Sequence, residues 1–154
     1  MDHETRIAEQ DHDALRLWLR LLACTNVIES AIRRKLRAEF ACTLPRFDLM
    51  AQLAREPEGL RMGDLSRRMM VTGANVTGIV DLLASDKLIS RLEVPGDRRA
   101  VRIRLTPKGR REFGRMARVH EGWVESIMSG LNAEQRSTLY ALLATLKQTA
   151  KENP

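Results

Sequence analysis

The residues with the clearest capacity for chemistry lie between positions 71 and 104, which read VTGANVTGIVDLLASDKLISRLEVPGDRRAVRIR. In the first half, small side chains occupy the positions that would face outward from a short helix: Gly73, Ala74, Asn75, Thr77 and Gly78. Small side chains let a helix backbone approach DNA closely, and the free N–H groups at a helix start bind phosphate. In the second half, a Pro-Gly-Asp turn ending at Asp97 precedes Arg98 and Arg99. A narrow minor groove concentrates negative potential and attracts such arginines, and Asp97 could orient one of them.

The net charge of +6 supports this interpretation because of where the charge lies. Between Leu60 and Arg110 there are 11 Lys or Arg residues and 5 Asp or Glu residues, whereas the remainder has 15 of each kind. A basic segment in a neutral scaffold is typical of a nucleic-acid-binding face. On charge alone, a solvated arginine-rich surface is an equal alternative. For the other basic run, residues 33–37, the solvated face is the favoured interpretation.

Two short helices and two strands would position these residues. A helix is predicted over Gly63–Met70, and a second one from its N-cap Thr72 to about Ser85, with Asn75 at the third helical position. The buried face of the second helix would consist of Val76, Ile79, Val80, Leu82 and Leu83. Over residues 89–94 and 100–105 the apolar residues recur with period two, which predicts strands. The pattern is that of a helix-turn-helix followed by a β-ribbon, or wing.

Amphipathic helices precede and follow this unit. Residues 11–41 form one continuous apolar pattern, and a helix of about 30 residues, near 45 Å long, is too long for a domain of this size to cover. We therefore expect part of it to pack against a second subunit. Thr43 is the predicted N-cap of a helix that ends near Arg55, and an extended piece follows at residues 60–62.

After the wing, two further helices are predicted. Thr106 and Pro107 would begin the first, which runs to Gly130, and Asn132 with Gln135 would form a capping box at the start of the second. The predicted fold is mainly α, a winged helix-turn-helix with a two-stranded β wing and long N- and C-terminal dimerisation helices. Residues 43–110 would form the DNA-binding lobe, and residues 1–42 and 111–154 the dimerisation region.

Several function classes find no support in the sequence. No run of about 18 apolar residues occurs, and the polar, acidic N-terminus is unlike a signal peptide, so we expect a soluble, cytoplasmic protein. No Ser-His-Asp, Cys-His or paired-carboxylate arrangement and no glycine-rich phosphate loop is present, so we predict no catalysis and no cofactor. His12 and His120 have no second ligand at metal spacing, and we predict no metal site.

The cysteines and tryptophans leave alternatives open. Cys24 and Cys42 could sense oxidants, but no neighbouring pattern indicates a lowered pKa, and burial is favoured, above all for Cys24 on the apolar stripe. Trp18 and Trp123 could stack on an aromatic ligand, although a place in a dimer core is favoured. A winged helix used only for protein interaction is a further alternative, as is an enzyme that uses a cavity between the terminal helices.

The order of elements, together with VTGANVTGIVDLL, Asp97-Arg98-Arg99 and LTPKG at residues 105–109, resembles the MarR family of bacterial transcription regulators. The resemblance covers nearly the whole chain. It implies a homodimer with interlocked terminal helices, whose two winged helices bind the halves of a pseudo-palindromic double-stranded DNA operator. It also implies a small effector, often an aromatic acid, bound between the dimer helices and the DNA-binding lobe. For this effector the candidate contacts are Trp18, Arg20, His120 and Trp123.

The resemblance also assigns roles in DNA binding. Asn75 and Thr77 match base and phosphate contacts, and Arg99 matches the arginine that enters the minor groove, steadied by Asp97. Thr72, Gly73 and Ala74 fall at the helix start. Gly78 replaces a longer, often basic residue, and Lys87 replaces the usual glycine after this helix. The runs PRFDLMAQL and VTGANVTG resemble a branch that controls hydroxycinnamate breakdown and responds to an aromatic acyl-CoA. The function expected from the sequence is a ligand-released repressor, with a cysteine-based redox regulator as the alternative.

Overall fold

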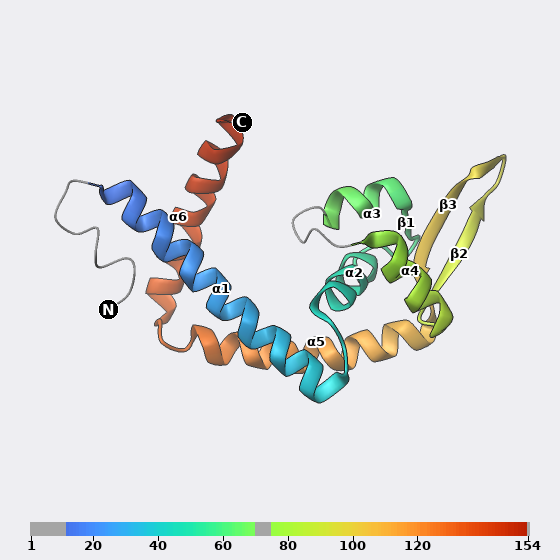
Figure 1. Cartoon of the computed structure of the whole chain (residues 1–154), viewed down its shortest axis with the longest axis horizontal. Coiled ribbons are helices and arrows are strands. Elements are labelled where there is room, and N and C mark those ends of the chain that lie inside the picture. The colour runs from blue at the N-terminus through green and yellow to red at the C-terminus, as the bar shows by residue number, and fades with distance from the viewer. Residues whose placement is uncertain (1–11, 70–74, 154) are drawn as a thin grey trace. The chain divides into compact units, whose positions relative to one another are not determined.

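The computed structural model describes residues 12–69 and 75–153, apart from the side chains of Arg98 and Arg99. The chain is mainly helical and has one small antiparallel sheet, as the sequence predicts (Figure 1). The elements are α1 (Asp13–Phe40), α2 (Leu44–Ala54), β1 (Leu60–Arg61), α3 (Met62–Met69), α4 (Val76–Ser85), β2 (Ile89–Val94), β3 (Asp97–Leu105), α5 (Pro107–Met128) and α6 (Ala133–Glu152). No helix in the described ranges is long and apolar enough to cross a membrane.

The contacts divide the chain into two compact units, one up to Arg118 and one from Val119 onward. The boundary falls within α5, so the first half of this helix belongs to the winged-helix unit and the second half to the unit that contains α6.

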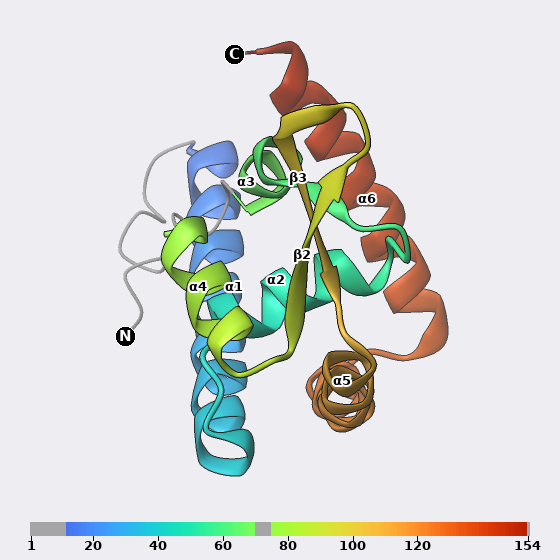
Figure 2. The ribbon, with the colours of Figure 1, turned by 90° about the vertical axis from the view of Figure 1, so that its right-hand side faces the viewer.

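The first unit has a single apolar core beneath the sheet. Its fully buried members come from α1, α2, α3, α4 and β3: Leu36, Leu49, Met50, Leu53, Leu65, Met69, Val80, Leu83 and Ile103. In Figure 2 the sheet stands in front, with α4 beside β2 and α2 behind. Burying such side chains contributes roughly 1.5–3 kcal/mol each, so this core holds α3, α4 and the wing in a fixed arrangement.

Side-chain caps set the starts of three helices where the sequence predicts them. The Thr43 hydroxyl accepts a hydrogen bond from the Arg46 amide at 3.3 Å. The Thr106 hydroxyl accepts one from the Gly109 amide at 3.0 Å. At α6, Asn132 and Gln135 form a reciprocal capping box. Each cap satisfies an amide that the helix leaves without an intrahelical partner, which contributes about 1 kcal/mol.

The start of α4 differs from the prediction. The described helix begins at Val76 and its N-cap is Asn75, whose side-chain oxygen accepts a hydrogen bond from the Gly78 amide at 3.1 Å. The assignment of Asn75 to the third position of a helix capped by Thr72 is therefore wrong. Thr72 and Asn75 are both good capping residues, and the sequence does not show which one is used.

The wing also differs from a simple two-stranded ribbon. The extended piece before α3 is β1, which pairs with β3, so the sheet has three strands in the order β1-β3-β2. From Ile89 paired with Leu105 to Glu93 paired with Val101 the register is regular, but Val94 pairs with Asp97. The turn is shorter than predicted, and residues 98–100 lie in an irregular stretch of β3.

Two helix faces expose large apolar side chains in the described chain. On α1 the exposed set is Leu15, Leu17, Trp18, Leu22 and Val27, and on α6 it is Leu139, Tyr140, Leu142, Leu143 and Leu146. Trp18 is 54% exposed and Tyr140 is 81% exposed. On α6, Leu139, Leu142, Leu143 and Leu146 recur at spacings of three and four and so share one side of the helix, and an exposed apolar side of this kind marks an interaction surface on soluble proteins.

Candidate nucleic-acid interface

The Asn75 side chain can both cap α4 and donate a hydrogen bond to a partner. Its Oδ1 atom caps α4, whereas its amide nitrogen is a donor at the exposed start of the helix. A Cβ atom on Gly78 would lie 3.0 Å from this nitrogen and 3.3 Å from Cγ. Gly78 therefore leaves room for the Asn75 side chain to fold over the first turn.

Of the other residues predicted at this helix, Thr77 lies in the first turn of α4 and is exposed. Thr72, Gly73 and Ala74 lie outside the described residues. Val76, Val80 and Leu83 are buried as predicted, but Leu82 is 57% exposed and does not belong to the buried face. The side of α4 available to a partner is thus small and polar near its start.

In the wing, Asp97 is exposed and begins β3. The backbone places Arg98 and Arg99 directly after it, in the stretch where the ladder is irregular. Their side chains are outside the described part of the structure. The contact between Arg99 and the minor groove, and the role of Asp97 in steadying it, remain predictions.

Most described cations of the basic segment bind other parts of the protein. Arg67 pairs with Asp64, Arg68 with Glu56 and Arg91 with Asp81, while Lys108, Arg102 and Arg110 donate to the backbone carbonyls of Asp86, Gly59 and Pro57. In the same segment, Arg61, Lys87 and Arg104 are exposed, and the described structure gives their side chains no such partner. The excess charge counted in the sequence therefore overstates the cations available to DNA.

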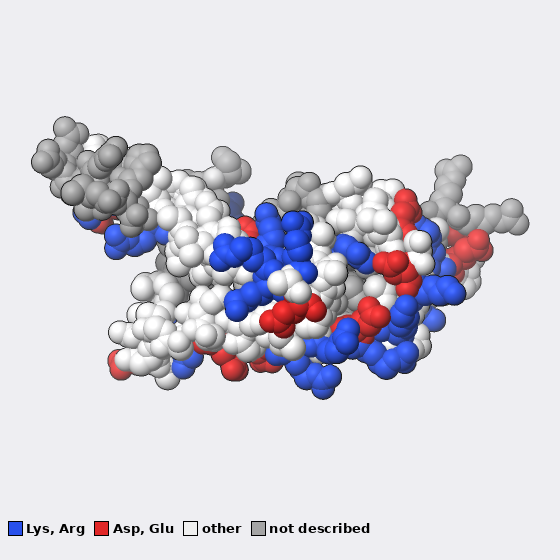
Figure 3. All heavy atoms as spheres, turned by 60° about the horizontal axis from the view of Figure 1, so that its bottom comes forward, with Lys and Arg blue, Asp and Glu red and all other residues white. Residues whose placement is uncertain are grey.

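One face of the sheet collects arginines. Arg61 lies opposite Arg102 across the β1–β3 pair, and Arg104 follows two residues later on the same side of β3. Arg102 is half-buried against Gly59, whereas Arg61 and Arg104 are exposed. Figure 3 shows that basic side chains are also abundant on the side of this unit where α1 ends and α5 begins. There the run 33–37 is solvated, apart from buried Leu36, and Arg33 pairs with Glu29 at 3.4 Å.

A tight corner connects α4 to β2. Lys87 has a left-handed backbone conformation with φ of 60°, where glycine is favoured. The Leu88 amide donates to the Leu83 carbonyl at 2.9 Å, and the Lys87 amide donates to the Ala84 carbonyl at 3.0 Å. These two bonds are the Schellman arrangement of a helix C-terminus. The absence of a glycine therefore does not change the turn, which Lys87 forms with some strain.

The LTPKG segment holds this corner against α5. The Thr106 hydroxyl donates to the Lys87 carbonyl at 2.7 Å, and the Thr106 amide donates to the Leu88 carbonyl at 3.0 Å. A Cβ atom on Gly109 would overlap the Leu88 carbonyl oxygen and lie 2.9 Å from its carbon. Glycine is needed at this position because α5 passes directly against the backbone that follows α4.

The four predicted effector contacts do not form one described site. His120 and Trp123 lie together on α5, with ring centroids 6.3 Å apart in an edge-on arrangement, and burial lowers the pKa of His120. Trp18 and Arg20 lie on α1, in the other unit, and both are exposed. The proposed combination of all four residues stays a prediction.

The two cysteines have opposite environments. Cys24 is exposed in the described chain, so its predicted burial on the apolar stripe is wrong for the single chain. Cys42 is buried, and its thiol donates to the Thr43 carbonyl at 3.4 Å. Burial raises the pKa of Cys42, an effect that the nearby Arg46 only partly opposes. Cys42 therefore has little thiolate character.

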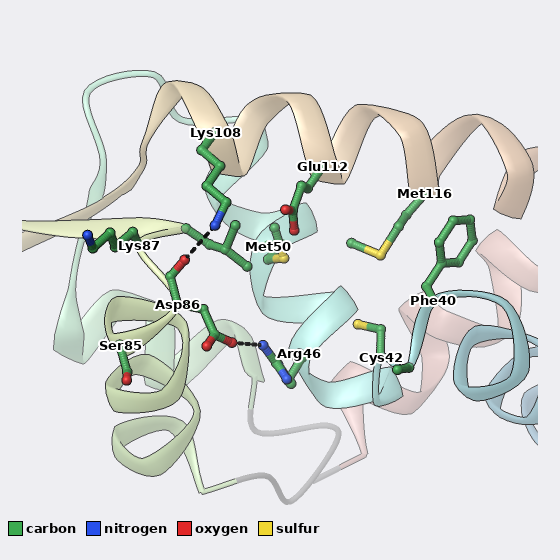
Figure 4. Close-up of a pocket in the computed structure, with 12 residues that line it drawn as sticks. Phe40, Cys42, Arg46, Met50, Ser85, Asp86, Lys87, Lys108, Glu112 and Met116 are labelled. Carbon is green, nitrogen blue, oxygen red and sulfur yellow. Dashed lines mark hydrogen bonds and ion pairs between the residues drawn. The ribbon is translucent and has the colours of Figure 1, made fainter.

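A pocket that the sequence did not predict lies in the first unit, between the end of α1, α2, the end of α4 and the start of α5 (Figure 4). Its volume is about 580 Å³. Among its lining residues, Arg46 donates to Asp86 at 2.7 Å. The pocket combines four segments far apart in sequence, so no local motif indicated it.

Comparisons with known proteins agree with this architecture. Residues 43–100 match the model of the MarR family. PecS of Dickeya dadantii, an HTH-type transcriptional regulator, is 26% identical over 121 residues, which is 77% of this chain and 73% of PecS. A MarR family regulator from Silicibacter pomeroyi has 27% identity and a TM-score of 0.76, covering 93% of this chain and 99% of that one. BpsR of Bordetella bronchiseptica, whose DNA binding is regulated by 6-hydroxynicotinic acid, has 24% identity and a TM-score of 0.72, covering 86% of this chain and 98% of BpsR.

The helix-turn-helix, the wing and the exposed polar start of α4 define a winged-helix transcription regulator that binds DNA, and not an enzyme. Its DNA-binding lobe thus matches the MarR family model, and the chain is similar to the MarR family regulator from Silicibacter over almost the full length of both chains.

Proposed function

We propose that the protein is a repressor that binds a pseudo-palindromic operator as a homodimer and is released by a small aromatic acid or its CoA thioester. The observation that carries this proposal is the geometry of α4. This helix begins with small and polar residues, and β2 of the wing follows it directly in the chain. Such a helix enters the major groove while a wing follows the adjacent minor groove. A dimer would place two of these units about 34 Å apart, one helical turn of DNA.

The exposed apolar faces of α1 and α6 support the homodimer. A single chain that left both faces in water would expose several large side chains on each. A second copy has the same faces and would cover them in an isologous interface. The effector class is supported by BpsR, because 6-hydroxynicotinic acid is an aromatic acid.

The effector proposal is tested by thermal melting of the chain with aromatic acids and their CoA thioesters. A ligand that binds only the folded protein raises its melting temperature. The same compound should lower DNA affinity in a fluorescence anisotropy titration. If a compound stabilises the protein but leaves DNA affinity unchanged, it is not an effector of the proposed kind.

For the wing, we predict that Arg99→Ala weakens operator binding by roughly 1 to 3 kcal/mol and reduces its salt dependence, because an arginine in the minor groove is lost. Anisotropy titrations at several salt concentrations measure both effects, and light scattering checks that assembly is unchanged. Arg55→Ala, at the exposed end of α2, is the control for loss of one positive charge. Equal affinities of the Arg99 variant and the wild type would contradict the prediction.

The redox alternative depends on Cys24, because it is the exposed cysteine and Cys42 has a raised pKa. The Cys24→Ser variant tests it. If peroxide releases DNA from the wild type but not from this variant, while organic acids have no effect on either protein, the redox function replaces the one proposed here.

A further inference from the structure

A second basic surface lies where α1 ends and α5 begins (Figure 3). Residues 29–40 and 107–118 contain nine Lys or Arg residues against three Glu residues, a net charge of +6. Arg33 is paired with Glu29. Five exposed arginines of these segments make no ion pair or hydrogen bond with the described residues, and they form what we call the arginine face: Arg34, Arg37, Arg111, Arg115 and Arg118. Their guanidinium groups are available to a partner outside the chain.

The arginine face consists of two rows that meet at one ring contact. On α5 its three arginines recur at spacings of four and three, so they share one side of the helix. On α1, Arg34, Arg37 and Phe40 recur at spacings of three and are neighbours on the helix surface. The guanidinium carbon of Arg115 lies 5.8 Å from the centre of the Phe40 ring. This cation–π contact joins the two rows into one surface.

The arginine face lies away from the groups that are predicted to contact operator DNA. In Figures 1 and 2 the wing extends away from α5, and α4 begins on the side of the wing tip. The end of α4 lies against α5, because Lys108 donates to the Asp86 carbonyl at 3.2 Å. Asn75 and Thr77 are at the opposite end of α4. A duplex bound by the start of α4 and by the wing would leave the arginine face open.

The composition of this surface favours DNA over an acidic protein as the partner. None of the large apolar side chains that are exposed in the described chain lies within residues 29–40 or 107–118. A protein interface needs a desolvated core with apolar or aromatic anchors, whereas cations alone suffice to bind the DNA backbone. The three arginines on α5 span about 10 Å at 1.5 Å per residue. Over that length one DNA strand carries roughly three phosphates.

We propose that the arginine face binds the phosphate backbone of a second DNA duplex, so that the protein holds two stretches of DNA on opposite sides of its winged-helix unit. Contacts to phosphate carry no sequence information, so the second duplex can have any sequence. The stacking of Arg115 on Phe40 holds one guanidinium in place before DNA arrives. The inference goes beyond the proposed function, which requires only the contacts made by α4 and the wing.

The test is a bridging assay with the full chain and two short duplexes of unrelated random sequence. One duplex is fixed on beads and saturated with protein, and the second carries a fluorophore. The wild type should retain the labelled duplex at low salt. Arg34→Gln with Arg37→Gln, and separately Arg111→Gln with Arg118→Gln, should each reduce this retention about tenfold or more. Each pair should also lower the slope of log affinity against log salt by about 2, because two phosphate contacts are lost.

The control, Arg55→Gln with Lys147→Gln, removes two exposed positive charges outside the arginine face and should bridge as the wild type does. The proposal is overturned if the wild type retains no labelled duplex at low salt, if either arginine pair can be replaced without loss, or if the control loses as much. It is also wrong if poly-glutamate displaces the labelled duplex at a lower charge concentration than unlabelled duplex does, because the partner is then an acidic protein. A wild type that fails to discriminate an operator from random DNA contradicts the proposed function, but the bridging assay, which uses no operator, still decides this one.

Discussion

At the scale of single residues, Lys87 has a backbone conformation that its side chain disfavours. A left-handed non-glycine residue costs about 1 to 2 kcal/mol, whereas glycine loses roughly 0.5 to 1 kcal/mol more conformational entropy on folding. We expect Lys87→Gly to raise the free energy of unfolding by about 0.5 to 1 kcal/mol, because the side chain is exposed and makes no described contact that would be lost. Chemical denaturation measures the change.

The control for Lys87→Gly is Lys87→Ala, which removes the charge and the long side chain but keeps a Cβ atom. It should bring no comparable gain in stability. If alanine stabilises the protein as much as glycine, the backbone conformation is not the cause.

Gly109 is the second residue at which a backbone requirement has a measurable effect. We expect Gly109→Ala to lower the free energy of unfolding by about 2 kcal/mol or more, because the added methyl group overlaps the Leu88 backbone and α5 must shift. Gly114→Ala, in the same helix, is the matched control. Its Cβ atom meets nothing within 4 Å, so it should stabilise the helix by up to about 1 kcal/mol. Two losses of equal size would indicate general sensitivity of α5 and contradict the argument.

At the scale of elements, α4 depends on Asn75 both for its cap and for its exposed amide. Asn75→Ala removes both functions, while Asn75→Ser keeps a capping oxygen and removes the amide donor. We expect the alanine variant to lose about 1 kcal/mol of stability and the serine variant much less. Both should lose preference for operator over random DNA. Denaturation curves and competition binding separate the two effects.

If the serine variant discriminates operator from random DNA as well as the wild type does, Asn75 only caps the helix. If both variants lose affinity equally for operator and random DNA, the contact is to the DNA backbone.

The elements that the sequence predicted well are those set by neighbouring residues. Thr43, Thr106 and the Asn132–Gln135 pair cap helices through bonds to residues three positions away, so their spacing is visible in the sequence. The beginning of α4 was misplaced because two good caps lie three residues apart. The third strand was not foreseen as part of the sheet, because a two-residue strand is defined only by its distant partner β3.

The site was predicted unevenly for the same reason. The sequence singled out Asn75, Thr77 and the arginines after the turn from their types and local order, and their contacts with DNA stay predictions. The Arg46–Asp86 pair spans 40 residues, and the pocket around it needs four segments to meet. Cys24 lies on the apolar stripe of α1, and the sequence does not show which part of that stripe is covered within one chain; in the single chain Cys24 is exposed.

At the scale of the whole molecule, the apolar face of α6 should hold two copies together. We expect Leu142→Glu to shift the protein toward monomers and to weaken binding to a two-half-site operator far more than to a single half-site, because a charge enters the interface. Leu142 is 58% exposed in the single chain, so the change should leave each unit folded. Light scattering and circular dichroism measure mass and folding.

Lys147→Glu, on the same helix, is the control for a charge change outside the apolar set. It should remain as oligomeric as the wild type. A wild-type chain that is monomeric at micromolar concentration, or a Leu142→Glu variant with unchanged mass, would show that α6 does not form the contact.

The pairing of β2 with β3 is regular next to the core and becomes irregular toward the turn of the wing. From Ile89–Leu105 to Glu93–Val101 the pairing is regular and the apolar residues alternate over the core, Ala100 is still buried, and residues 95–97 at the turn are exposed. Charge changes at these exposed turn residues would therefore leave the buried core unchanged. Over evolution, regulators built on this scaffold can therefore acquire new DNA preferences by exchanging a few wing residues, without a matching change in the core.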